Sequence, residues 1–403
     1  MSFRITALEF ARYRGFRDSQ CASLARLTLL YGENNAGKSA FVRVFPLLAG
    51  SRVQGRPGLN LDTPVFRGAG FLDVKWRGVL PVEDDKDLVL GLRLSDGTTW
   101  RWTFEWLDTK STAALRMLEV NGDGQGETFE LVPLGNLAAK DAEYTTSTGT
   151  KRIRLDGLIP RESVGALTDE RRAALISALD GVIWLGALRK GPPREGTPRG
   201  AQGSLAGDGE GAAALVLADK ALRLQVSTWF RNLAPFHVEA ESLGPDLERL
   251  VLRPTDPGHD VPFPDTGEGL QQAFPVITAL EQLRQQGGTL CVEEPESHLH
   301  PRLQKALAEH VVSVLANQPN ANVVLETHSE VFLLAALAAA TKPLAGAVGL
   351  FWTEVASDGA GKVESIPIDE AGRPTTPRLE QAFSTMGVMR RQLLADRKAL
   401  LER

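Results

Sequence analysis

One stretch of the sequence decides most of the fold: Leu27-Thr28-Leu29-Leu30-Tyr31-Gly32-Glu33-Asn34-Asn35-Ala36-Gly37-Lys38-Ser39. An apolar, strand-like run ends at Gly32 and opens a loop with the P-loop spacing G-x-x-x-x-G-K-S/T. Glycines let consecutive backbone N–H groups surround phosphate oxygens, and the helix that follows points its positive end at the same anion. Lys38 would reach the β- and γ-phosphates, and the Ser39 hydroxyl would bind Mg²⁺. The stretch predicts a site for ATP and Mg²⁺ made by Gly32, Asn34, Asn35, Ala36, Gly37, Lys38, Ser39 and Ala40.

The composition is typical of a globular protein, with 403 residues of which 43% are hydrophobic and 24% charged. No apolar run approaches the ~20 residues that span a bilayer, and the N-terminus has no signal-peptide pattern, so we expect no membrane partner. Cys21 and Cys291 are too few for a disulfide framework. We therefore expect a cytoplasmic, reducing location. A net charge of -5 gives no global basic footprint for nucleic acid.

Hydrophobic periodicity divides the chain into a β-rich first half and an alternating second half. Strands are expected from residue 3 to 10 and repeatedly between 87 and 159, and a helix follows the P-loop to about residue 48. The second half alternates helix and strand, which favours a parallel sheet covered by helices. Its predicted elements are helices over 212–230, 270–286, 301–315 and 330–340 and strands over 289–293 and 322–326.

A Gly/Pro-rich stretch from residue 191 to 211 is predicted to be a long loop. Basic side chains gather at its start, namely Arg189, Lys190, Arg194 and Arg199. They would form either a phosphate-contacting loop or a solvated connector.

A second motif supplies carboxylates. The run Thr289-Leu290-Cys291-Val292-Glu293-Glu294-Pro295-Glu296 is an apolar strand that ends in adjacent acids. Neighbours on a strand point to opposite sides, but both acids can converge on the site where the chain turns at the strand's carboxyl end. We predict that Glu293 holds Mg²⁺, directly or through water, and that the catalytic Glu294 polarises the attacking water.

Two further segments could contact phosphate. Asp265-Thr266-Gly267-Glu268-Gly269 opens a helix about twenty residues before the acidic strand, as a second anion-binding helix terminus would. His328, in Thr327-His328-Ser329, follows a strand and could contact the γ-phosphate and the attacking water. His298 and His300 lack further ligands at suitable spacing, so we read them as interface residues rather than a zinc site.

Together these motifs resemble the ABC-type ATPase heads of the SMC, RecF and OLD group, and particularly the compact OLD-like AAA-family ATPases of bacterial anti-phage defence operons. The resemblance implies an α/β fold: an ABC-type P-loop ATPase head with a mixed or parallel sheet core, a β-rich N-terminal lobe and an α/β C-terminal lobe. It divides a single head, residues 1–403, into three parts. These are residues 1–185 with the P-loop and a β-rich insert at about 85–160, residues 186–230 with the Gly/Pro-rich loop and a helix, and residues 231–403 with the remaining motifs and a helical tail.

The resemblance also implies a partner. Two copies would meet head to head, as a homodimer or a higher even-numbered oligomer, with ATP between the P-loop of one copy and Thr266, Gly267, Glu268 and Gly269 of the other. The motifs depart from the family pattern at two places: Glu293 stands where Asp is usual, and Asp265-Thr266 stands where Leu-Ser is usual.

What the sequence lacks narrows the function that the resemblance implies. We find neither a long coiled coil, as in SMC proteins, nor a Toprim nuclease domain, as in OLD nucleases. We therefore expect an ATPase that controls an effector encoded nearby, a nuclease in anti-phage defence. The alternatives are a RecF-like repair ATPase that binds DNA directly, and an ATP-binding scaffold with little turnover.

Overall fold

A six-stranded sheet carries the P-loop, in the order β11-β15-β16-β3-β17-β18. The first five strands run parallel and β18 is antiparallel to β17. Their bounds are β3 (Leu27–Gly32), β11 (Val182–Leu185), β15 (Gly288–Glu293), β16 (Ala321–Glu326), β17 (Val348–Val355) and β18 (Gly361–Ile366). In this computed structural model the described residues are 3–53, 58–78, 87–107, 112–132, 141–197, 205–233, 235–369 and 373–375.

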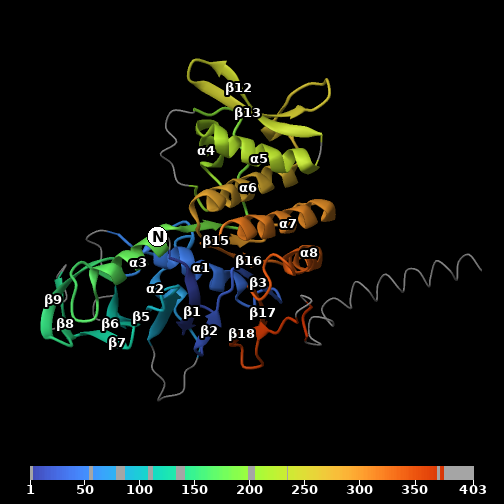
Figure 1. The fold of residues 1–403 in the computed structure, drawn as a ribbon. Helices are drawn as coiled ribbons and strands as arrows, with labels where there is room; N and C mark the ends of the chain where they lie inside the picture. The colour runs from blue at the N-terminus through green and yellow to red at the C-terminus, as the bar shows by residue number, and fades with distance from the viewer. Residues whose placement is uncertain are drawn as a thin grey trace, which may run out of the picture.

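Helices cover both faces of this sheet because alternate residues of each strand point to opposite sides. Leu29, Val292 and Leu325 belong to one core, with the helices α6 (Glu268–Gln286), α7 (Pro301–Asn317) and α8 (Glu330–Ala340). Leu30 and Val324 belong to a second core, with α1 (Lys38–Gly50). In Figure 1, α6, α7 and α8 are stacked one above another, with α8 level with β16.

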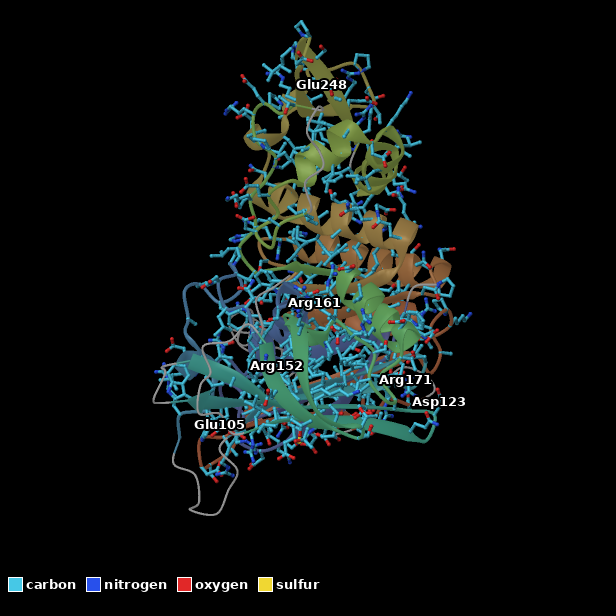
Figure 2. All side chains as sticks on the ribbon, turned by 90° about the vertical axis from the view of Figure 1, so that its left-hand side faces the viewer. Glu105, Asp123, Arg152, Arg161, Arg171 and Glu248 are labelled. Carbon is cyan, nitrogen blue, oxygen red and sulfur yellow. The ribbon has the colours of Figure 1, made fainter. Side chains whose placement is uncertain are left out.

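A nine-stranded antiparallel sheet adjoins α1, in the order β10-β9-β8-β7-β6-β5-β4-β1-β2. Alternate buried rings on β5, those of Trp100, Trp102 and Phe104, fill the core that this sheet shares with α1 and α3. Figure 2 looks toward this part of the molecule, where Arg171 of α3 lies beside Asp123 of the β6–β7 turn. The elements are β1 (Ile5–Ala11), β2 (Gln20–Ser23), α2 (Phe71–Val74), β4 (Leu88–Leu94), β5 (Thr99–Leu107), β6 (Thr112–Gly122), β7 (Gln125–Leu131), β8 (Asp141–Thr146), β9 (Gly149–Asp156), β10 (Ile159–Pro160) and α3 (Asp169–Asp180).

The remaining elements form the far end of the molecule in Figure 1. Here α4 (Ala212–Ala218) and α5 (Lys220–Leu233) lie beneath a small sheet of β12 (Phe236–Gly244), β13 (Leu247–Pro254) and β14 (Val261–Pro262), followed by the short helix η2 (Phe263–Asp265). The single helix predicted over 212–230 is wrong. Asp219 is extended, and its side chain accepts hydrogen bonds from the N–H groups of Ala221 and Leu222, so it ends one helix and caps the next.

The predicted fold class is confirmed: the described residues form a mixed α/β head with a parallel core sheet and a β-rich N-terminal part. The division into residues 1–185, 186–230 and 231–403 stays a prediction. The expected tail helix, residues 378–403, lies outside the described residues. None of the helices in the described ranges has the length and apolar character needed to cross a membrane.

Candidate functional site

The P-loop joins β3 to α1 in a conformation that needs its glycines. Gly32 and Gly37 both have positive φ, at 151° and 92°. A Cβ at Gly32 would clash with the backbone of Thr353, and one at Gly37 would clash with the Phe16 ring. No other residue fits either position without strain, so the glycines at both ends of the loop are explained by backbone geometry.

Lys38 begins α1 and is buried, with 3% of its surface exposed. Its Nζ donates hydrogen bonds to the carbonyl oxygens of Gly32 at 3.0 Å and Glu33 at 2.6 Å. Burial lowers the pKa of the ammonium group, while the charges of Glu326 and Glu294 oppose that shift. A buried cation held by neutral carbonyls favours binding of an anion such as a phosphate.

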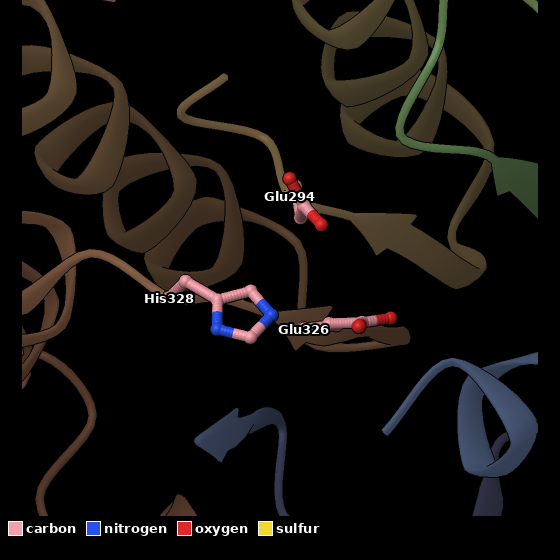
Figure 3. A group of neighbouring side chains, drawn as sticks. All are labelled: Glu294, Glu326 and His328. Atoms are coloured by element: carbon pink, nitrogen blue, oxygen red, sulfur yellow. The ribbon is translucent and has the colours of Figure 1, made fainter. Parts of the chain in front are cut away.

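Three polar side chains meet at the carboxyl edge of the sheet (Figure 3). The ligand atoms of Glu294, Glu326 and His328 all lie within 4.8 Å of one another. Glu326 also accepts a hydrogen bond from the Ser39 hydroxyl at 2.8 Å. Burial, helped by the charge of Glu293, raises the pKa of Glu326 to about 7. The structure thus brings Ser39, Glu294 and His328 together as predicted, and it adds Glu326.

Glu293 takes a different position from the one expected. Its carboxylate accepts two hydrogen bonds of 2.6 Å from the Arg43 guanidinium and one of 3.1 Å from Trp184 Nε1, and the residue is 2% exposed. Ser39 and Arg43 lie one turn apart on α1, while Glu293 and Glu326 are paired in register on neighbouring strands. Each helix residue therefore contacts one acid, and Ser39 contacts Glu326 rather than Glu293. The assignment of Mg²⁺ to Glu293 remains untested, but these contacts favour Glu326.

The histidine loop is held by an acid to which the sequence analysis gave no role. Glu296 Oε1 accepts hydrogen bonds from Thr327 Oγ1 at 2.7 Å and from the N–H groups of His328 and Ser329 at 2.9 and 3.1 Å. Burial raises the pKa of Glu296. The last acid of Glu-Glu-Pro-Glu thus fixes the backbone that carries His328.

A cavity of about 910 Å³ opens over these groups. This volume is within the range of small-molecule and cofactor sites. Sequence reasoning missed Arg14, Arg43 and Glu326 as lining residues. Arg14 lies between the strand expected over residues 3–10 and the one that ends at Gly32, where no motif marks it. The cavity is lined by Arg14, Gly15, Asn34, Asn35, Ala36, Gly37, Lys38, Ser39, Ala40, Arg43, Glu294, Glu326, His328, Val355, Gly359 and Gly361.

The signature loop, residues 266–269, is not among the residues that line this cavity. Thr266 Oγ1 donates to the carbonyl of Phe263 at 2.7 Å, and a Cβ at Gly269 would lie 2.5 Å from the carbonyl oxygen of His298. At Gly267, which caps α6, a Cβ would meet nothing within 4 Å. Gly267, at the start of α6, therefore has free space beside it and does not line the cavity of its own chain.

In the basic loop Lys190 and Arg194 are exposed, as in a solvated connector, whereas the buried Arg189 fits neither expectation. Arg189 is buried, Lys190 forms ion pairs with Asp208 and Glu210, and Arg194 forms a bidentate pair with Asp265 at 3.0 and 2.5 Å. Arg199 lies outside the described residues. As for His298 and His300, neither belongs to a group of potential metal ligands in the described ranges.

Comparisons with known proteins bear on the fold of the chain and on one segment of it. Residues 206–335 match the family described as "AAA domain, putative AbiEii toxin, Type IV TA system". No curated protein matches the sequence significantly. Among solved structures, an SMC head bound to the C-terminal winged-helix domain of ScpA has a TM-score of 0.54 at 12% identity, covering 91% of this chain and 99% of that one.

A second SMC head, bound to the C-terminal domain of ScpA derived from Pyrococcus furiosus, has a TM-score of 0.53 at 11% identity, covering 96% of this chain and 100% of that one. At such identities the likeness concerns the fold. The chain therefore has the fold of an SMC head, and residues 206–335 match the model of an AAA domain.

Proposed function

We propose that the chain binds ATP with Mg²⁺ in the 910 Å³ cavity and hydrolyses it, and that a second copy completes the site. The observation that carries the proposal is the convergence of Lys38 and Ser39 with Glu294, Glu326 and His328, which come from three neighbouring strands and their following segments. The direct test is Mg²⁺-dependent phosphate release from ATP by the purified chain. Absence of release at saturating ATP and high protein concentration would contradict it.

The residues present fit a divalent cation. Glu326 Oε1 contacts Ser39, while its other oxygen, Oε2, is buried and has no hydrogen-bond partner among the described residues. A buried, unpaired carboxylate oxygen is costly unless a cation or a proton reaches it. Ser39 and Glu326 would hold Mg²⁺, which neutralises charge on the β- and γ-phosphate oxygens when bound.

Glu294 and His328 suit the hydrolytic step. In that step the water oxygen bonds to the γ-phosphorus, the bond to the β–γ bridging oxygen breaks, and ADP leaves. Glu294 would accept the proton of the attacking water, and His328 would face the γ-phosphate. The His328 backbone is fixed by Glu296, so its ring is positioned before the nucleotide arrives.

The proposed second copy is supported by the place of the signature loop. Its helix terminus is open at Gly267 and does not line the chain's own cavity, yet it has the properties of an anion site. A partner's γ-phosphate would occupy it when two heads meet. ATP would then close the dimer and hydrolysis would open it.

We further propose that this cycle controls an effector protein encoded nearby, a nuclease in anti-phage defence. The support is the matched family, whose description names a toxin–antitoxin system and so a two-component module. Affinity purification from the native host, with ATP and with ADP, should recover an effector in a nucleotide-dependent way. Recovery of the chain without a partner in both states would contradict this part of the proposal.

The metal assignment can be tested by comparing the two buried acids. Glu326→Gln should raise the Mg²⁺ concentration needed for half-maximal hydrolysis about 10- to 100-fold, because a ligand next to Ser39 is lost. Glu293→Gln should mainly destabilise the fold, by about 2 kcal/mol, because Arg43 loses its charged partner. Mg²⁺ titrations and thermal unfolding of both variants measure this. The reverse pattern would return the metal to Glu293.

Gly267→Glu tests the trans role of the signature loop. A Cβ at Gly267 would meet nothing within 4 Å, and a carboxylate beside the N-terminus of α6 favours the helix dipole, so folding and ATP binding should be unchanged. The added carboxylate should repel a partner's γ-phosphate and lower ATP hydrolysis about 10-fold or more. Equal losses of binding and hydrolysis would contradict a role in trans.

A further inference from the structure

Arg189 is the buried cation that the functional cavity does not use. It lies on the loop after β11 and is 4% exposed. Its guanidinium donates to the carbonyl oxygens of Gly186 at 2.7 Å, Gln272 at 3.1 Å, Glu293 at 2.9 Å and Glu294 at 3.0 Å. Burial lowers the pKa of Arg189 to about 10, although the nearby acids oppose the shift. A cation buried at this cost gains by holding several backbone segments in one geometry.

These bonds connect two functional segments. The Arg189 N–H also donates to Gln272 Oε1 at 3.1 Å, and Gln272 Nε2 donates to Glu268 Oε1 at 2.9 Å. Glu268 belongs to the signature loop, and Gln272 lies one turn further along α6. A continuous chain of hydrogen bonds therefore runs from Glu268 through Gln272 and Arg189 to the backbone of Glu294.

The backbone of Glu294 has a conformation that the hydrogen bond from Arg189 can stabilise. Glu294 has a φ of 45°, a conformation that non-glycine residues adopt only when their surroundings hold them. Its N–H donates to the Glu326 carbonyl, and its own carbonyl accepts from Arg189. Arg189 thus helps to fix the Glu294 backbone, while the Glu294 carboxylate accepts a hydrogen bond from Ser297 Oγ at 3.0 Å.

The same loop is attached to the signature loop at a second point. Arg194 pairs with Asp265, the residue before Thr266, and a Cβ at Gly191 would lie 2.7 Å from Cβ of Gln271 on α6. Residues 186–194 therefore follow the start of α6 closely enough to move with it.

We propose that Arg189 is a positioning residue that couples the signature loop to Glu294. A phosphate that docks on α6 of one subunit shifts or stiffens that helix, and Arg189 transmits this to the Glu294 of the same subunit. Hydrolysis at one site of the dimer is thereby licensed by the nucleotide at the other. The proposal rests on the proposed ATPase function, and it adds a link between the two sites.

The test compares Arg189→Lys and Gln272→Met with a control variant, Arg253→Lys. Arg253 lies exposed on β13, where it forms an ion pair with Asp260. ATP affinity is measured by titration, kcat and KM by phosphate release, and folding by thermal unfolding. Arg189→Lys should lower kcat about 10-fold or more with ATP affinity unchanged, because a misplaced catalytic group loses rate rather than binding. Gln272→Met should do the same, and the double variant should be no slower than the worse single variant.

Two results would overturn the coupling. One is an Arg189→Lys enzyme with wild-type kcat, and the other is a loss of ATP affinity and thermal stability equal to the loss of kcat, which would mark Arg189 as structural only. The same assay measures hydrolysis by the wild-type protein and its loss in Glu294→Gln. If the wild-type protein does not hydrolyse ATP and Glu294→Gln shows no loss, the proposed ATPase function is wrong. If both results are as expected and Arg189→Lys has wild-type kcat, only the coupling is wrong.

Discussion

Lys38→Ala should weaken ATP binding about 100-fold or more. The ammonium group is buried at the start of α1 and its described partners are two carbonyl oxygens, so it is held where a phosphate would reach it. Removing one partner of a buried charge pair costs about 2–5 kcal/mol, which corresponds to this loss of affinity. Titration with a fluorescent ATP analogue measures the change.

Lys305→Ala is the matched control for that experiment. Lys305 lies exposed on α7 in an i,i+4 pair with Glu309, and exposed pairs contribute little, so ATP affinity should stay at the wild-type value. An unchanged ATP affinity in Lys38→Ala would show that the P-loop does not bind ATP.

Glu294→Gln should keep ATP binding and lower hydrolysis about 100- to 10,000-fold, because the amide cannot accept a proton from the attacking water. The neutral side chain is nearly the same size, so the cavity keeps its shape. With hydrolysis blocked, the ATP-bound dimer should accumulate, which analytical ultracentrifugation with and without ATP would detect.

Glu309→Gln provides the charge-matched control and should hydrolyse ATP at the wild-type rate, because Glu309 lies half-exposed on α7. Wild-type hydrolysis in Glu294→Gln would place the base elsewhere, and Glu326 would be the next candidate.

The parallel core of the fold was readable from the sequence because its signals are local. The apolar runs of β3, β15 and β16 are buried along nearly their whole length, as parallel strands require. The helices between them carry clear periodicity, so α6, α7 and α8 were predicted within a few residues. The hairpin of β12 and β13 was missed, because its burial pattern is broken and its pairing is set by tertiary packing.

The site was partly readable for the same reason. The P-loop residues and Glu294 could be predicted because they belong to motifs in which the chemistry requires a fixed spacing between residues. The partner of Ser39 does not, since it depends on which strand lies beside β3. That strand is β16, so Glu326 reaches Ser39, while Glu293 one strand further away contacts Arg43. The role of Arg189 was also out of reach, because its partners Gln272, Glu293 and Glu294 lie more than eighty residues away in the sequence.

The central claim is that each ATP site is shared by two copies, and mixing two inactive variants tests it most directly. Lys38→Ala loses the P-loop and Gly267→Glu loses the signature loop, so a mixed dimer keeps one intact site. Because hydrolysis at that site would also need nucleotide at the other, the quantity to measure is ATP-dependent association. Equal mixing should recover about half of the wild-type amount of ATP-bound dimer, since about half of the pairs are mixed and each keeps one intact site. A mixture that stays monomeric with ATP, as each variant alone should, would contradict the shared site.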